Sequence, residues 1–83
     1  MTNKILVTVI VPMIEEEYDI YIPVSKTIKL TLKLLSKTIN ELSEGHFPLK
    51  ENNVLLSSTG AMFTNNFTIK DCGIKNGDKI VLI

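Results

Sequence analysis

The sequence has little of what several classes of protein require. Its 83 residues contain one cysteine, so no internal disulfide can form, and this favours a reducing compartment such as the cytoplasm. The positive and negative residues balance at nine each, which removes any general attraction to nucleic acid or to an anionic membrane. No apolar run approaches the roughly 20 residues that span a bilayer. We therefore expect a cytoplasmic protein that neither binds nucleic acid nor inserts into a membrane.

Residues that carry out chemistry are equally sparse. His46 is the only histidine, and no second histidine or cysteine stands at metal-ligand spacing from it. We find no Ser/His/Asp set, glycine-rich phosphate loop or basic–aromatic surface pattern. Cys72 is expected to be a small buried hydrophobic residue rather than a reactive thiol. The sequence therefore predicts no catalytic residue, no cofactor site and no metal site, and the protein is not expected to be an enzyme.

The clearest pattern present is one amphipathic helix, predicted over residues 27–44. Its apolar residues recur at spacings of four, three, four and three, which places them on one face of a helix. These residues are Ile28, Leu32, Leu35, Ile39 and Leu42. Thr27 can cap the first turn through its hydroxyl, and Gly45 stands where a left-handed residue would end the helix. The helix is long enough to cross a small sheet, and the apolar face is expected to pack on it.

The charges of this helix are arranged against its own dipole. Two lysines lie near its N-terminus and two glutamates near its C-terminus, namely Lys26, Lys29, Glu41 and Glu44. Each such charge destabilises an isolated helix slightly, so the helix must depend on packing. The lysine-rich outer face is expected to be solvated, and a binding stripe for an acidic partner is the alternative.

Stretches rich in β-branched residues predict strands at residues 4–11, 18–22, 53–57 and 79–83, with a very short one at 61–63. Residues 67–74 resemble a tight helical turn that carries two isoleucines into the core. In the strands at 53–57 and 79–83, the inward positions are expected to be filled by Val54, Leu56, Ile80 and Leu82. This assignment turns Leu55 and Val81 outward.

The predicted order of elements resembles the ubiquitin-like β-grasp family. The matching places are Pro23 before the helix, Thr27 and Ile28 opening it, Gly45 after it, and the segment Thr-Ile-Lys-Asp-Cys-Gly-Ile at 68–74 before the last strand. The resemblance implies an α+β fold in which one long helix packs across one face of a mixed sheet of four to five strands. It also implies a single ubiquitin-like domain over residues 1–83.

Within this family the chain is most similar to small bacterial proteins of the YukD/EsaB type. The similarity lies in the compact length, the extended helix and the Asn-Gly-Asp turn at 76–78. That group accompanies the type VII (ESX, WXG-type) secretion systems of Gram-positive bacteria. The resemblance implies a cytoplasmic accessory or regulatory component whose partner is another protein, and a component of the secretion system is the candidate. A homodimer is a separate candidate, which the continuous apolar strands suggest.

Conjugation to other proteins is not expected. A conjugated ubiquitin, or a sulfur carrier of the same fold, needs a flexible tail that ends in Gly-Gly, whereas this sequence ends at Ile83 within a predicted strand. Two alternatives stay open: a modifier or sulfur carrier that has lost its tail, and a self-assembling structural protein that uses an apolar sheet face.

The resemblance to ubiquitin also indicates where a partner would bind. The positions that match ubiquitin's main recognition patch are Leu55 and Val81 on the sheet with Met13 and Ile14 at the first hairpin tip, and Leu6 and Ile83 could widen it. The same face could instead form a homodimer. A second candidate contact is the pair Leu30 and Leu34, which lies on the helix opposite the predicted core face.

Overall fold

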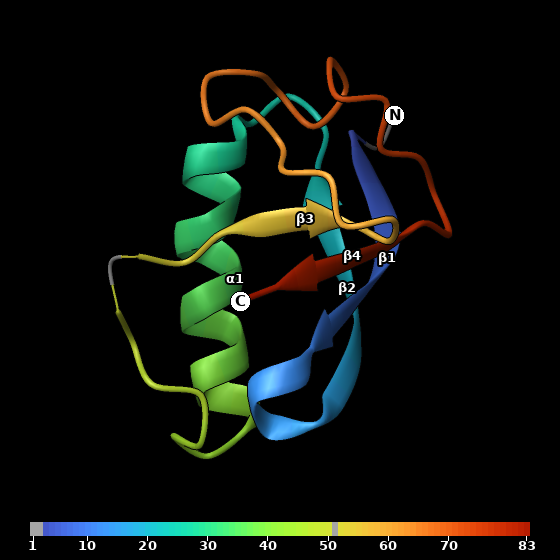
Figure 1. Cartoon of the computed structure of the whole chain (residues 1–83). Helices are drawn as coiled ribbons and strands as arrows, with labels where there is room; N and C mark the ends of the chain where they lie inside the picture. The colour runs from blue at the N-terminus through green and yellow to red at the C-terminus, as the bar shows by residue number, and fades with distance from the viewer. Residues whose placement is uncertain (1–2, 51) are drawn as a thin grey trace.

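The computed structural model describes residues 3–50 and 52–83. Within these residues one helix lies across one face of a four-stranded sheet (Figure 1). The elements in chain order are β1 (Lys4–Val11), the short 3-10 helix η1 (Pro12–Ile14), β2 (Glu16–Pro23), α1 (Ile28–Leu42), β3 (Leu55–Ser57) and β4 (Lys79–Leu82). The predicted α+β architecture is confirmed.

The sheet is mixed, with strand order β2-β1-β4-β3. The two ends of the chain supply its central pair, because β1 runs parallel to β4 with Val9 opposite Ile80. On either side β2 is antiparallel to β1, and β3 is antiparallel to β4. Among the described residues the predicted strand at 61–63 amounts to a single bridge between Met62 and Leu56. The predicted helical turn at 67–74 is a run of turns, and it does bury Ile69 and Ile74.

The first hairpin follows from its composition. Side chains alternate along β1, with Val7, Val9 and Val11 fully buried against the helix side. Pro12 ends the strand because it cannot donate to the ladder. The chain then reverses through η1, and Glu15 adopts a left-handed conformation (φ 54°) whose N–H donates to the Pro12 carbonyl oxygen at 3.1 Å.

The helix begins as the sequence predicts. The Leu30 N–H donates to Thr27 Oγ1 at 3.3 Å, which caps the first turn. The chain leaves the helix through Glu44 and Gly45, both left-handed, and the Gly45 N–H donates to the Asn40 carbonyl oxygen at 2.8 Å. Four of the five residues of the predicted apolar stripe are buried.

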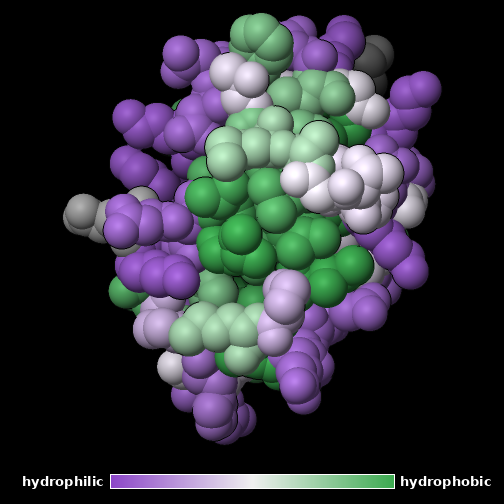
Figure 2. All heavy atoms as spheres, viewed as in Figure 1, coloured by the Kyte–Doolittle hydropathy of each residue, from purple (hydrophilic) through white to green (hydrophobic). Residues whose placement is uncertain are grey.

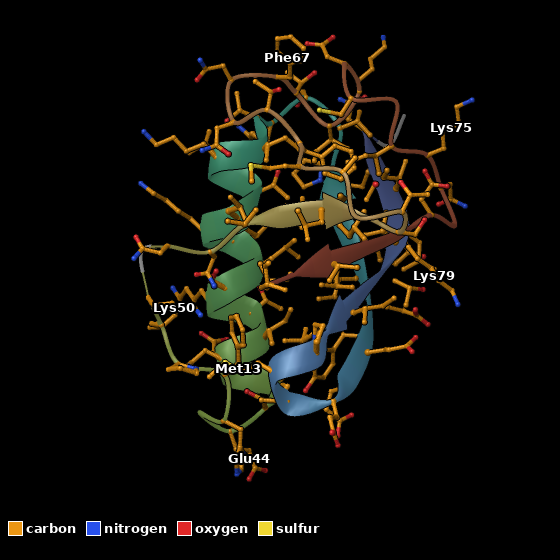
Figure 3. All side chains as sticks on the ribbon, viewed as in Figure 1. Met13, Glu44, Lys50, Phe67, Lys75 and Lys79 are labelled. Carbon is orange, nitrogen blue, oxygen red and sulfur yellow. The ribbon has the colours of Figure 1, made fainter. Side chains whose placement is uncertain are left out.

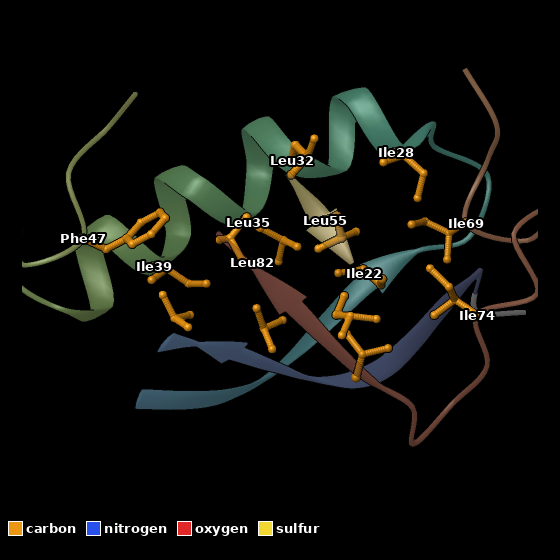
Figure 4. Close-up of a cluster of buried hydrophobic side chains, with 14 residues drawn as sticks. Ile22, Ile28, Leu32, Leu35, Ile39, Phe47, Leu55, Ile69, Ile74 and Leu82 are labelled. Carbon is orange, nitrogen blue, oxygen red and sulfur yellow. The ribbon is translucent and has the colours of Figure 1, made fainter. Parts of the chain in front are cut away.

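The fifth, Leu42, was wrongly assigned to the core, because its side chain is 55% exposed. Phe47, from the loop after the helix, fills that end of the core instead and is fully buried beside Ile39 (Figure 4). Two hydrogen bonds to α1 and its cap hold the loop there. The Phe47 N–H donates to Ser43 Oγ at 3.0 Å, and Asn40 Nδ2 donates to the Phe47 carbonyl oxygen at 2.8 Å.

The predicted register of β3 was wrong by one residue. Leu55 pairs with Leu82 and is 1% exposed, so both side chains point toward α1. Directly paired residues share a face of the sheet, and Leu56 therefore points away from the helix together with its partner Val81. The outward orientation predicted for Val81 is correct. Leu55 is therefore a core residue. Leu56, which was predicted to point inward, occupies the outward position that was predicted for Leu55.

No helix among the described residues has the length and apolar character needed to cross a membrane.

Candidate protein-binding surfaces

The face of the sheet away from α1 carries an apolar row three strands wide. Val81 on β4 lies directly opposite Ile10 of β1 on one side and Leu56 of β3 on the other. All three side chains are half-buried, whereas the next residues along each strand, Val9, Ile80 and Leu55, are buried under the helix. The row therefore lies at the surface of the sheet and is not part of the core under the helix.

Neighbouring apolar residues extend this row. Met62 is bridged to Leu56 and strongly exposed. Val54 and Ile83 exchange two backbone hydrogen bonds, at 2.8 and 3.0 Å, and strand alternation puts both on the outward face. We call this surface the outer sheet patch: Ile10, Val54, Leu56, Met62, Val81 and Ile83. Figure 2 shows apolar atoms gathered in the middle of the molecule over β3 and β4, with hydrophilic residues around them.

A polar border adjoins the patch on β1 and β2. Thr8 lies two residues before Ile10 on the same face, opposite Asp19 of β2 and Lys79 of β4. Thr8 Oγ1 donates to Asp19 Oδ1 at 2.7 Å. Leu6, predicted to widen the patch, lies on the outward face beyond this border and is half-buried, opposite the exposed Tyr21. An apolar centre with a polar rim is the usual anatomy of a protein interface.

The structure separates the predicted patch residues. Val81 belongs to the outer sheet patch and Leu55 to the core. The sequence analysis did not select Ile10 for the patch, although alternation along β1 places it on the outward face with Thr8. It also missed Leu56 and Met62, because a three-residue strand beside an isolated bridge has too little alternation to show its register.

Met13 and Ile14 line a separate hollow between the hairpin tip and the end of α1. We call it the tip hollow: Met13, Ile14, Glu16, Tyr18, Leu42, Ser43, Glu44 and His46, around a volume of about 760 Å³. Met13 is 57% exposed, and Ile14 packs against the core. Figure 3 shows Met13 and Glu44 at the same end of the molecule, where the helix ends and the hairpin turns.

Polar acceptors stand around this hollow. His46 Nδ1 lies 2.6 Å from the Ser43 carbonyl oxygen, which can only accept, so the ring donates from Nδ1 and a neutral ring keeps Nε2 as an acceptor. Glu16 and Glu44 add two exposed carboxylates. The tip hollow thus combines apolar side chains with groups that attract a cationic side chain.

The outer face of α1 is exposed as predicted. Leu30 is 51% exposed and Leu34 is 44% exposed, one turn apart and away from the sheet. Lys29, Lys33 and Lys37 are exposed around them. This face therefore presents leucines within a lysine stripe.

The structure gives little support to chemistry at Cys72. Its side chain is half-buried, less shielded than predicted, and packs against the core. Burial, followed by the nearby charge of Asp71, raises the pKa of the Cys72 thiol, which disfavours the nucleophilic thiolate. Within residues 3–50 and 52–83, no group of three His, Cys, Asp or Glu side chains is placed to hold a metal ion.

No protein-family model matches the sequence, and no curated protein does. The structure, in contrast, matches the N-terminal ubiquitin-like domain of the 4931431F19Rik protein with a TM-score of 0.77 at 15% identity, over 100% of this chain and 76% of that one. The chain has the ubiquitin-like fold. At so low an identity, the likeness establishes the fold alone.

Two further solved structures match this ubiquitin-like chain. The ubiquitin-like domain of the Mycobacterium tuberculosis type VII secretion system protein ECCD1 matches with a TM-score of 0.75 at 11% identity, over 96% of this chain and 97% of that one. A chain of the MycP5-free ESX-5 inner membrane complex matches with a TM-score of 0.82 at 15% identity. That match covers 98% of this chain but only 21% of the other.

Proposed function

We propose that this ubiquitin-like chain is a protein–protein interaction module, an accessory or regulatory component of a type VII secretion system of the YukD/EsaB kind. It acts in the cytoplasm of a bacterium by non-covalent contact and without catalysis. The observation that carries the proposal is the outer sheet patch, an apolar surface on a face of the sheet that the helix leaves uncovered.

The patch suits a partner for a physical reason. The core is complete on the helix side, where Val9, Leu55 and Ile80 are fully buried. A partner that covers the apolar side chains of the other face stabilises the complex by about 25 cal/mol per Å² of apolar surface removed from water. An apolar centre with a polar border is the usual arrangement of an interface, and the contacts that matter most for affinity cluster near such a centre.

The link to secretion rests on the comparisons and on the resemblance of the sequence. One similar domain is named as part of a type VII secretion system protein, and another lies in a much longer chain of an ESX-5 inner membrane complex. These two structural matches support a role in which the domain binds other proteins of the secretion system.

A homodimer formed through the same patch is the second candidate. The row Ile10, Val81 and Leu56 crosses three strands without a charged residue, which is typical of a sheet face that another layer covers. A two-fold dimer would bury this row against its own copy.

The test uses Leu56→Asp and Val81→Asp against the matched control Leu49→Asp, which puts the same charge at an exposed leucine of the loop after α1, outside the outer sheet patch. Purified type VII components from the same genome are titrated against each folded variant, and sedimentation measures the mass of each variant alone. We expect both patch variants to lose binding at least tenfold while Leu49→Asp binds as the wild type. Unchanged binding by the patch variants would contradict the proposal, and a loss of a wild-type dimer in their sedimentation would select the homodimer.

A further inference from the structure

The net charge of zero conceals an uneven distribution. Glu15, Glu16 and Glu17 lie around the hairpin tip, and Glu41 and Glu44 lie at the end of α1 next to it. Among the described residues, the lining of the tip hollow includes two glutamates and no lysine. The first turns of α1 carry the opposite charge, with three exposed lysines on their outer face. One molecule thus presents both an acidic and a basic surface.

The basic surface is complementary to the acidic surface in charge, and both surfaces carry exposed apolar side chains. At about 100° per residue, Lys29, Leu30, Lys33, Leu34 and Lys37 fall within an arc of about 140° on the helix side away from the core. We call this arc the basic helix face. It combines two half-exposed leucines with flanking lysines, whereas the tip hollow combines exposed Met13 and Leu42 with Glu16 and Glu44.

The helix does not need its charges in this order for its own stability. α1 has no acidic residue in its first turn and no basic residue in its last turn. The helix dipole favours the reverse arrangement, so the lysines and glutamates destabilise the free helix slightly. The stability of the single molecule does not explain this charge order, whereas a contact between two molecules does.

We propose that the tip hollow of one molecule binds the basic helix face of a second copy of the chain. Leu30 and Leu34 of the second copy pack against Met13 and Leu42 in the hollow. The lysines beside those leucines approach Glu16 and Glu44. The proposal is independent of the proposed function, because neither surface includes a residue of the outer sheet patch.

The contact is head-to-tail, since it joins two different surfaces that share no residue. Each complex therefore keeps one free hollow and one free helix face, and association continues into open chains or closes into a ring. Charge pairs at exposed surfaces are screened by salt, so the association should weaken as the ionic strength rises.

Two charge-reversal variants test the pairing. E16K/E44K makes the hollow basic, and K29E/K33E makes the helix face acidic. We expect the average mass of the wild type, measured by sedimentation equilibrium, to rise above 9.3 kDa as its concentration increases from about 10 µM to about 1 mM. Each variant alone should stay a monomer, because its two surfaces then carry the same charge. Mixing the two variants should restore the higher mass, since each surface again meets its opposite.

The control K70E/K75E changes the net charge by the same amount as K29E/K33E but at exposed positions outside both surfaces, and it should associate as the wild type. Because K29E/K33E and E44K improve the charge order along α1, these variants should melt no lower than the wild type, which separates lost association from lost folding. A wild type that stays monomeric at about 1 mM would overturn the proposal. So would association that both variants retain, or a mixture that fails to recover it.

Discussion

The two faces of the β3–β4 pair differ in burial although their composition is nearly the same. Leu55 and Leu56 are adjacent and chemically identical, yet Leu55 is buried under α1 and Leu56 faces outward. On the facing strand Leu82 and Val81 divide in the same way. A shift of the register by one residue would exchange the two sets. Whether an apolar residue is buried in the core or lies at the surface is therefore decided by the pairing of strands and not by its chemistry.

The largest effect is expected on the buried face. Leu55→Asp places an unpaired charge among the fully buried side chains of the core, and this penalty is comparable with the total stability of a domain of this size, about 5 kcal/mol. We expect the variant to be unfolded at 25 °C by circular dichroism. A folded Leu55→Asp protein would show that Leu55 does not face the core.

The same contrast recurs at the end of α1, where Phe47 is buried and Leu42 is exposed. Phe47→Ala removes an aromatic ring from the core and should lower the free energy of unfolding by about 3–5 kcal/mol. Leu42→Ala, its matched control on the exposed side, should change it by less than about 0.5 kcal/mol. Urea titrations of the two variants measure both values, and equal losses would place Leu42 in the core after all.

On the outward face the cost should be modest. Leu56→Asp puts its charge into water rather than into the core, so only strand preference and cross-strand packing are lost, about 1 kcal/mol. Its thermal unfolding should remain cooperative, with a small decrease in Tm. Unfolding as severe as that of Leu55→Asp would mean that another layer of the molecule covers this face.

The smallest effect concerns Cys72, which is neither fully buried nor exposed. Burial and the charge of Asp71 raise the pKa of its thiol above the ordinary 9.0, so the folded protein holds the proton more tightly than the unfolded chain. Its contribution to stability is present below that pH and is lost as the pH rises through the folded pKa. Alkylation at pH 8 should be slower in the native state than in denaturant, and Asp71→Asn should speed the native reaction. Equal native and denatured rates would contradict this placement.

Local sequence patterns were sufficient for most of the elements. The rhythm of α1, the β-branched run of β1 and the cap at Thr27 each act through neighbouring residues, so their structure could be predicted without knowing the rest of the chain. The order of the elements and the turns between them then led to the ubiquitin-like fold. Val81 was correctly turned outward because Ile80 and Leu82 alternate with it in β4.

The errors occurred where a choice depended on distant residues. Val54, Leu55 and Leu56 form an apolar run with no alternation, so only pairing with β4 decides which of them faces α1. The apolar stripe of α1 continues to Leu42. This residue is nevertheless exposed, because Phe47 from the following loop fills that end of the core. Most of the helix and strand segments could be predicted from the sequence alone, because those preferences are local. Which apolar residues remain at the surface could not, because burial depends on what packs opposite each side chain in the folded chain.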